Sequence, residues 1–219
     1  MEALIGYALF QAVLLARLIP WIRHQAFAAS YWAFTFDSAA DFLECSRSDE
    51  AACLVLDVQL PDISGLELQG RLADDNSPPV IFISGHSDVP STVRAMKAGA
   101  IEFLLKPVPG EVLLTSVRAA LAKDKIARRQ RSELTRLRER YSRLSQRERE
   151  VFPLVVSGLL NKQSASVLGI AEVTLQVHRR QIMSKMEAGS LAELVRIATR
   201  LGISPASVAR PRADRPPSM

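Results

Sequence analysis

Residues 161–186 read NKQSASVLGIAEVTLQVHRRQIMSKM, and this stretch decides the fold of the C-terminal half. It predicts two helices joined at Gly169, because glycine readily adopts the positive-φ turn that ends one helix before another begins. The first helix has an expected packing face made of Ala165, Val167 and Leu168, with Ile170 closing the corner. The stretch therefore predicts a helix-turn-helix whose second helix is basic, which is an arrangement that reads DNA.

The second helix of this stretch carries an apolar and a polar set of side chains. The residues expected to face inward, at roughly helical spacing, are Val173, Val177, Ile182 and Met186. The residues left for the outer side are Thr174, Gln176, His178, Arg179, Arg180 and Lys185. These side-chain types suit a DNA groove, because threonine bonds phosphates, glutamine pairs with adenine, and arginine binds guanine or a phosphate.

Three segments of the C-terminal half together resemble the LuxR-type helix-turn-helix of FixJ-like response regulators: LSQREREV, GLLNKQSASVLGI and VTLQVHRRQIMSKM. The similarity runs from about Leu144 to Ile203. Gln176 stands where the family commonly has lysine, and Ala171 replaces the usual serine or threonine cap, whose loss typically costs about 1 kcal/mol. The alternative interpretation is a small helical bundle with a solvated charged face.

We predict two kinds of DNA contact from this helix-turn-helix. The residues expected first to read bases are Gln176, Val177 and Arg180. The residues expected to bind phosphates are Lys162, Thr174, Arg179 and Lys185. By the resemblance, the last helix, which ends before Gly202, forms a dimer contact. A dimer would set two recognition helices about one DNA turn apart, roughly 34 Å, and favour a palindromic operator.

Two Ser-x-x-Glu pairs predict helix starts in this half, Ser145 with Glu148 and Ser190 with Glu193. Pro153 falls inside the first of these helices and is expected to kink it, since proline removes a backbone donor.

The charge of the chain is divided unevenly between its halves. The 219 residues are 48% hydrophobic, which is enough for a core in each of two domains. Residues 1–122 have 8 Lys and Arg against 14 Asp and Glu, a net −6, and residues 123–219 have 20 against 9, a net +11. The basic half therefore suits a polyanion, and the acidic half suits a metal or a basic partner.

From Tyr31 onward, short apolar runs alternate with amphipathic segments, which predicts an α/β domain with a doubly wound parallel sheet. The expected strands are Trp32–Phe36, Cys53–Leu56, Val80–Ile83 and Ile101–Leu105, and the expected helices are Ala39–Cys45, Leu66–Leu72, Val89–Ala98 and Glu111–Leu121. Asp57, Ser84 and Lys106 each follow a strand. Because the carboxyl ends of parallel strands meet at one edge, these three groups are expected to converge there and to bind a phosphoryl group.

The segments LVLDVQLPDISGLEL and IFISGHSDVPSTVRAMKAGAIEFLLKP resemble the receiver domain of two-component response regulators, from about Phe34 to Leu121. The resemblance implies that Asp57 accepts phosphate from a sensor histidine kinase, that Ser84 and Lys106 contact the phosphoryl group, and that Phe103 is the aromatic switch. It also implies a cis Lys106–Pro107 bond. The simpler alternatives are an ordinary acid in a loop for Asp57 and a core residue for Phe103.

The N-terminal residues depart from the receiver pattern. Receivers have two or three acids after their first strand, and these hold the Mg²⁺ used in phosphoryl transfer. Here that cluster would fall near Val13 to Leu15, yet Glu2 is the only acid before Asp37. We therefore expect Asp57 to be a poor acceptor, and Mg²⁺ to bind only if other groups hold it. The explanation is either an altered reading frame or start site, or a degenerate receiver.

Ala3–Ile22 is long and mostly apolar, but Gln11 and Arg17 interrupt it. A helix packed on the receiver-like domain is favoured over a membrane anchor. The histidines and cysteines are scattered along the chain, so no metal site made of His and Cys is expected.

The charged segment 123–143 predicts a helical linker. Its apolar seam of Leu134, Leu137, Tyr141 and Leu144 is expected either to meet its copy in a dimer or to belong to a solvated linker helix. The predicted division is a receiver-like domain at 1–122 with an atypical 1–30, the linker, a DNA-binding domain at 144–204 and a disordered Pro- and Arg-rich tail at 205–219.

The resulting hypothesis is a cytoplasmic, homodimeric regulator of transcription that binds double-stranded DNA, receives phosphate at Asp57 from a histidine kinase, acts on RNA polymerase and has no enzymatic activity. One alternative is a DNA-binding regulator that works without phosphorylation and uses its first domain for dimerisation or inhibition. Another is an acyl-phosphate enzyme with Asp57 as nucleophile, although its nearest second acid, Asp62, is more simply a turn residue.

Overall fold

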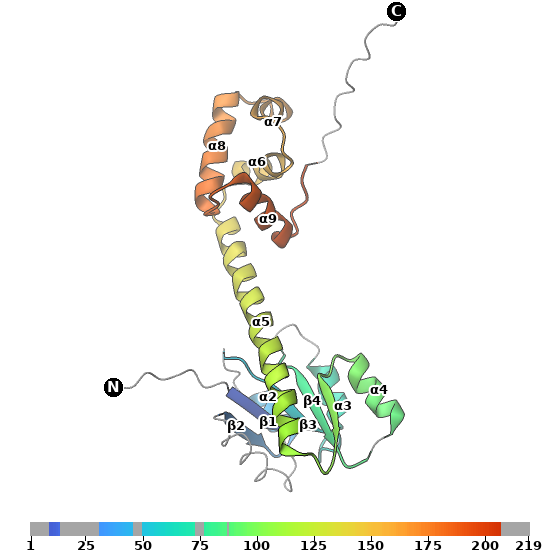
Figure 1. Ribbon diagram of the computed structural model, residues 1–219. Coiled ribbons are helices and arrows are strands. Elements are labelled where there is room, and N and C mark those ends of the chain that lie inside the picture. Colours follow the sequence, from blue (N-terminus) through green and yellow to red (C-terminus); the bar gives the residue numbers. More distant parts are fainter. Residues whose placement is uncertain (1–8, 14–30, 46–49, 73–76, 87, 207–219) are drawn as a thin grey trace, which may run out of the picture. The chain divides into compact units, whose positions relative to one another are not determined.

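The computed structural model describes residues 9–13, 31–45, 50–72, 77–86 and 88–206. The chain divides into two compact units, residues 1–130 and 131–219, whose elements are labelled in Figure 1. One long helix, α5 (Gly110–Ser142), begins in the first unit and ends in the second. The predicted linker at 123–143 is therefore the continuation of the helix predicted at Glu111–Leu121.

The first unit is built on a parallel sheet with strand order β2-β1-β3-β4-β5. Its strands are β1 (Leu9–Val13), β2 (Trp32–Phe36), β3 (Leu54–Asp57), β4 (Val80–Ser84) and β5 (Glu102–Leu105). Every residue of β3 and β4 is buried. Both therefore read as nearly continuous apolar runs, as parallel strands covered on both faces do.

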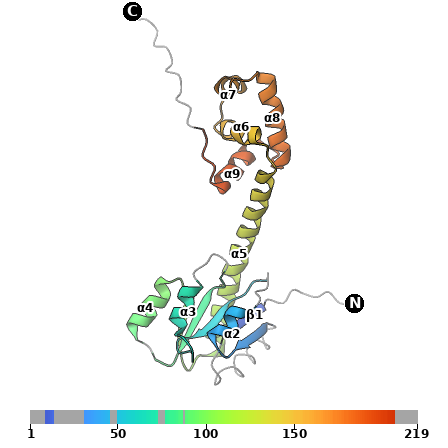
Figure 2. The ribbon, with the colours of Figure 1, turned by 180° about the vertical axis from the view of Figure 1, so that it is seen from behind.

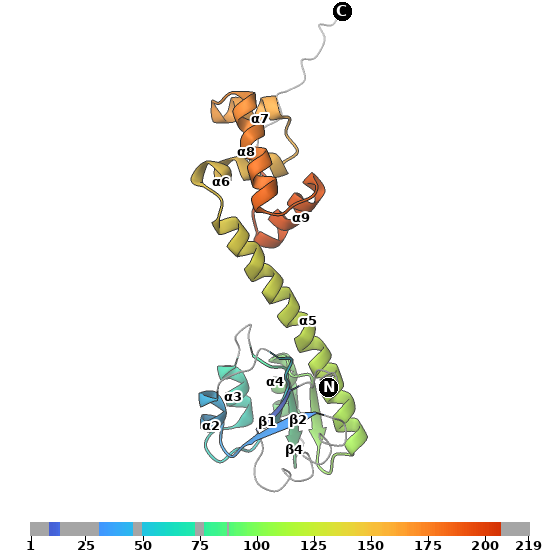
Figure 3. The same ribbon diagram turned by 90° about the vertical axis from the view of Figure 1, so that its left-hand side faces the viewer.

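Helices cover both faces of this sheet. On one face of the sheet, the side chains of Val55, Ile81 and Ile83 pack against α5. On the opposite face, the side chains of Leu54, Leu56 and Phe82 belong to a second hydrophobic cluster. That second face is covered by α2 (Ala39–Glu44), α3 (Gly65–Arg71) and α4 (Val89–Lys97), onto which Figure 2 looks. Figure 3 shows α2 and α3 on one side of the strands and α5 on the other, which confirms the predicted α/β layering.

The strand β1 was not predicted from the sequence. Leu9–Val13 lies between β2 and β3 and pairs with both, so the expected packed helix is wrong at these five residues. The rest of the segment 3–22 lies outside the described residues. Within the part of the chain that the structure describes, no helix is long and apolar enough to cross a membrane.

The second unit is a cluster of helices around one apolar core. After the end of α5 come α6 (Gln146–Val156), α7 (Asn161–Leu168), α8 (Glu172–Lys185) and α9 (Leu191–Leu201). Fully buried Val151, Phe152, Ile182, Met186 and Leu194 form the centre of the core. The predicted helix-turn-helix corresponds to α7 and α8, and the predicted tail lies outside the described residues from residue 207 onward.

The helix ends of this unit follow the sequence signals closely. Gly169 ends α7 with φ 62°, and Ser145 forms a complete capping box with Glu148 at the start of α6. Ser190 caps α9, but the Glu193 carboxylate accepts from Gly189 N–H at 2.9 Å, so this second box is only half formed. Ala171 begins α8 without a side-chain cap, as its methyl group predicts.

The apolar seam of α5 packs inside the second unit. Leu137 and Leu144 are buried in its core, and the Tyr141 ring packs edge-on against Phe152 with centroids 5.7 Å apart. The two expectations for this seam, a dimer contact and a solvated linker helix, are therefore both wrong for these three residues. Their apolar surface is already used within the chain.

Candidate phosphoryl site and nucleic-acid interface

The sheet brings Asp57 and Lys106 together at the carboxyl ends of its strands. Asp57 ends β3, Lys106 follows β5, and Lys106 Nζ lies 2.5 Å from Asp57 Oδ2. Asp57 is buried, and its other oxygen, Oδ1, accepts from the Gln59 N–H at 2.9 Å. The carboxylate is thus neutralised by one ammonium group and oriented by a backbone amide.

Ser84 ends β4 between these two residues, and its carbonyl accepts from Lys106 N–H at 2.8 Å. Its hydroxyl donates to the His86 carbonyl at 2.6 Å. The strand pattern predicts that Asp57, Ser84 and Lys106 converge at one edge of the sheet, and their backbone positions confirm this. In this arrangement the Ser84 hydroxyl is bound by the following loop.

Gly65 closes the loop behind the acid. Its N–H donates to the Val58 carbonyl at 2.9 Å, and a Cβ built on Gly65 would lie only 2.3 Å from the Asp57 carbonyl oxygen. Any larger residue would push against the backbone that carries the carboxylate, so the close approach requires glycine here. This role of Gly65 was not recognised from the sequence.

The Lys106–Pro107 bond matches what the receiver resemblance implies, and Phe103 lies on the preceding strand, β5. The Phe103 ring is half-buried on β5, with its centroid 6.0 Å from that of Phe82. The Lys106–Pro107 peptide bond is cis. Phe103 thus packs partly against the core and is partly open to solvent.

The sequence that follows β1 does not fit Mg²⁺. Val13, the last residue of β1, pairs with Leu56, so the carboxyl end of β1 stands next to Asp57, and the residues that follow are Leu14 and Leu15. Leucine offers no oxygen to a metal that prefers carboxylates. Within the described residues, no group of three or more His, Cys, Asp or Glu side chains could hold a metal.

Asp62 holds the start of α2. Its carboxylate accepts from the N–H groups of Ala39 at 3.4 Å and Ala40 at 3.2 Å. Desolvation raises the pKa of Asp62, but these backbone donors outweigh it and hold the pKa below its ordinary value. The geometry thus gives Asp62 a helix-capping role.

The inward face predicted for the recognition helix α8 is confirmed for Ile182 and Met186 but not for the two valines. Leu175, Ile182 and Met186 are buried, whereas the residues Val173 and Val177 are 71% and 51% exposed. The inward prediction is therefore wrong for both valines, and Val167 on α7 is likewise exposed. Because residues 173, 176, 177 and 180 follow helical spacing, they share one open face of α8.

The residues predicted to contact DNA fall into two groups. Lys162, Thr174, Gln176, Val177 and Arg180 are exposed, whereas Arg179, Lys185 and the outward-predicted His178 are half-buried. Arg179 Nη1 donates to Asn161 Oδ1 at 3.0 Å, which ties α8 to the start of α7. Asn161 was missed as a partner because the contact joins two helices and leaves no pattern in the sequence.

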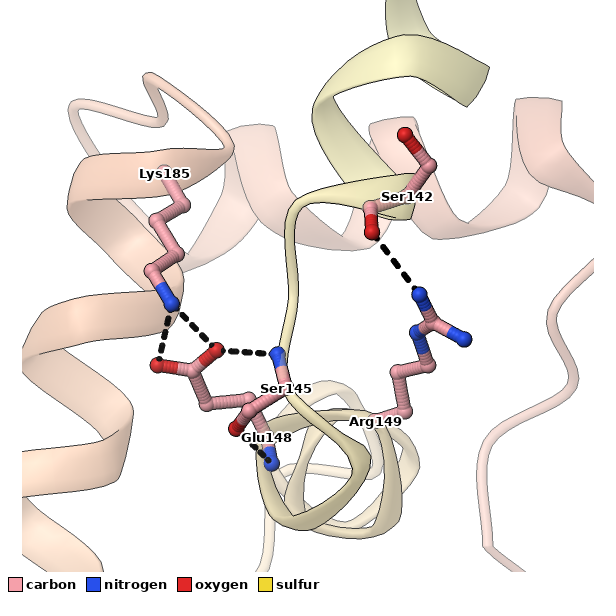
Figure 4. A network of polar contacts seen from close by, with 5 residues as sticks. All are labelled: Ser142, Ser145, Glu148, Arg149 and Lys185. Carbon is pink, nitrogen blue, oxygen red and sulfur yellow. Dashed lines mark hydrogen bonds and ion pairs between the residues drawn. The ribbon is translucent and has the colours of Figure 1, made fainter.

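Lys185 is bound to a buried carboxylate of α6. Its ammonium donates to both oxygens of Glu148, at 2.9 and 2.7 Å, and Glu148 Oε2 also accepts from Ser145 N–H at 2.6 Å (Figure 4). Desolvation raises the pKa of Glu148, but the hydrogen bonds from Lys185 and Ser145 and the lysine charge hold it below its ordinary value. Lys185 thus has an acidic partner within the chain.

Two family patterns match the chain. Residues 21–118 match the response regulator receiver domain, and residues 142–198 match the bacterial regulatory proteins of the luxR family. The receiver match begins after β1, so Leu9–Val13 lies outside it.

Named relatives and one solved structure agree with these matches. The chain is 47% identical to Nodulation protein W of Bradyrhizobium diazoefficiens over 170 residues, 77% of this chain and 75% of that protein. It is 44% identical to the transcriptional regulatory protein FixJ of Azorhizobium caulinodans, over 80% of this chain and 83% of that protein. The response regulator StyR superposes with a TM-score of 0.78 and 41% identity, over 88% of this chain and 99% of that one.

Proposed function

Because the chain belongs to the FixJ-like family of DNA-binding two-component response regulators, with a receiver and a LuxR-type helix-turn-helix, we propose that Asp57 is its phosphoryl acceptor. The protein is a regulator of transcription and not an enzyme. The observation that carries the proposal is the Asp57–Lys106 pair at the sheet edge, with Ser84 on the strand between them.

Each group at this edge has a proposed task in phosphoryl transfer. An Asp57 oxygen attacks the phosphorus of the kinase phosphohistidine, and the P–N bond to the imidazole breaks as the P–O bond forms. Lys106 then pairs with a phosphoryl oxygen. Ser84 exchanges its bond to the His86 carbonyl for one to the phosphoryl group, and Phe103 moves inward.

The same proposal covers the partners. The acyl phosphate favours homodimers through α4, β5 and α9, and the dimer binds a palindromic operator in the cytoplasm and acts on RNA polymerase. Gln176, Val177 and Arg180 read bases, while Lys162, Thr174 and Arg179 bind phosphates. Lys185, which the sequence also assigns to a phosphate, is instead paired with Glu148. The exposure of Gln176, Val177 and Arg180 on one face of α8 supports their assignment to base reading.

A second candidate function dispenses with phosphorylation. Receiver domains typically bind Mg²⁺, yet β1 ends at Val13 and is followed in the chain by Leu14 and Leu15 in place of acids. Lys106 forms an ion pair with Asp57. On this view the first unit is a constitutive dimerisation or inhibitory module, and DNA binding does not depend on phosphate.

Acyl-phosphate labelling decides between the two functions. The full-length protein is treated with acetyl phosphate, with and without Mg²⁺, and its intact mass is compared with that of Asp57→Asn. We expect one phosphate on the wild type and none on the variant, because only the carboxylate can form the acyl phosphate. An unlabelled wild type that still binds duplex DNA would reject the phosphorelay and leave the second function.

A further inference from the structure

The contacts of two neighbouring residues, Glu148 and Arg149, connect α6 with α8 and with the end of α5. Its side chain is 2% exposed at the start of α6, and it binds Lys185 in the last turn of α8. The next residue, Arg149, donates to the carbonyl of Ser142 at the end of α5, at 2.8 Å (Figure 4). The end of the recognition helix is thus joined through two neighbouring residues of α6 to the end of the long helix.

We propose that Glu148 and Lys185 are a positioning pair that fixes α8 for base reading, and that Lys185 does not itself bind a DNA phosphate. This inference rests on the proposed role of α8 in reading DNA. If the Lys185 ammonium turned to a phosphate, the buried Glu148 carboxylate would lose its only cationic partner among its described contacts. Lys162, which is exposed on α7, has no such constraint among the contacts described.

The two possible roles of the pair predict opposite effects of Glu148→Gln. If charge alone matters, removing a negative group from the DNA-binding unit strengthens binding to a polyanion. If the pair positions α8, the same substitution loosens the end of the helix and weakens base reading. The sign of the change therefore separates the two roles.

The binding experiment uses full-length protein and two labelled duplexes. One is a duplex enriched from a random library by the wild-type protein, and the other is an unselected random duplex of the same length. We expect Glu148→Gln to raise Kd roughly tenfold for the enriched duplex and less than about twofold for the random one. The slope of log K against log salt concentration, here called the salt slope, should not change. Equal or tighter binding to the enriched duplex would overturn the proposal.

Lys162→Met is the matched control, because it removes one lysine charge from the DNA-binding unit without touching the pair. This substitution should weaken binding to both duplexes by the same factor and lower the magnitude of the salt slope by about 0.9. Amine labelling of the wild type on the random duplex adds a test that needs no variant. DNA should protect Lys162 and leave the labelling of Lys185 unchanged, whereas protection of Lys185 by DNA would overturn the proposal.

Amide exchange separates this proposal from the proposed function. In the free protein, Glu148→Gln should speed exchange at residues 182–186 while the core of α6 keeps its protection. Unchanged exchange there would reject the positioning pair even if the protein reads DNA. A wild type that enriches no duplex would instead reject base reading by α8, and the exchange result would still decide whether the pair holds the helix.

Discussion

The ion pair between Glu148 and Lys185 is unequal in burial, which predicts unequal effects on stability. The glutamate side chain is 2% exposed and the lysine side chain 37%. Lys185→Met leaves the buried Glu148 carboxylate without its cationic partner, so we expect this substitution to lower the free energy of unfolding by about 3–5 kcal/mol. Glu148→Gln leaves a lysine that water can reach, so the free energy of unfolding should fall by less in this variant. Urea denaturation of both variants measures the difference. Equal losses would show that the lysine is as desolvated as its partner.

The pH dependence of the stability of Glu148→Gln provides the control. Because the native pKa of Glu148 lies below its ordinary value of 4.5, the pair stabilises the fold fully above that value. The stabilisation is lost as the pH falls through the lower native pKa. The stability difference between wild type and Glu148→Gln should therefore be constant from about pH 7 to 5.5 and shrink below about 4.5. A difference that grows in acid would contradict this assignment of charge.

The hydrogen bond between α7 and α8 predicts coupling of Asn161 and Arg179 in DNA binding. Asn161 Oδ1 orients the guanidinium, so Asn161→Ala should weaken binding to a random duplex without changing the salt slope. Arg179→Ala should weaken binding and lower the slope by about 0.9 if it removes one phosphate contact. In a double-mutant cycle, the double variant should bind like Arg179→Ala alone. Additive losses would mean that Asn161 acts independently of the arginine.

The helices that begin with a polar cap were predictable from local sequence. Ser38, Ser64 and Asp88 each accept from a backbone N–H three residues on, and these caps place the starts of α2, α3 and α4. The inward face of α8 was not predictable in the same way. Val173 and Val177 are apolar but exposed, and a rule that turns apolar residues inward fails on a surface proposed to contact the apolar parts of DNA bases.

The strand β1 could not be distinguished from a helix by its own residues. Leu9–Val13 belongs to a long apolar run, and such runs have no period that separates a buried strand from a buried helix. Its identity depends on pairing with β2 and β3, which begin more than 20 residues later. The edge containing Asp57, Ser84 and Lys106 was predictable because each follows a short apolar strand, whereas the close approach of Gly65 to Asp57 depends on backbone geometry across a loop.

The two units of the molecule carry opposite charge, and this predicts how the first unit affects DNA binding. Residues 1–130 have a net charge of −3 and residues 131–219 a net charge of +8. A tethered negative unit is repelled by DNA over about a Debye length, which is about 10 Å at 0.1 M salt. A fragment of residues 131–219 should therefore bind a random duplex several-fold more tightly than the full chain at low salt, and equally above about 0.5 M, where charges are screened. Tighter binding by the full chain at every salt concentration would contradict this, and would mean that the first unit adds affinity by pairing two chains on one duplex.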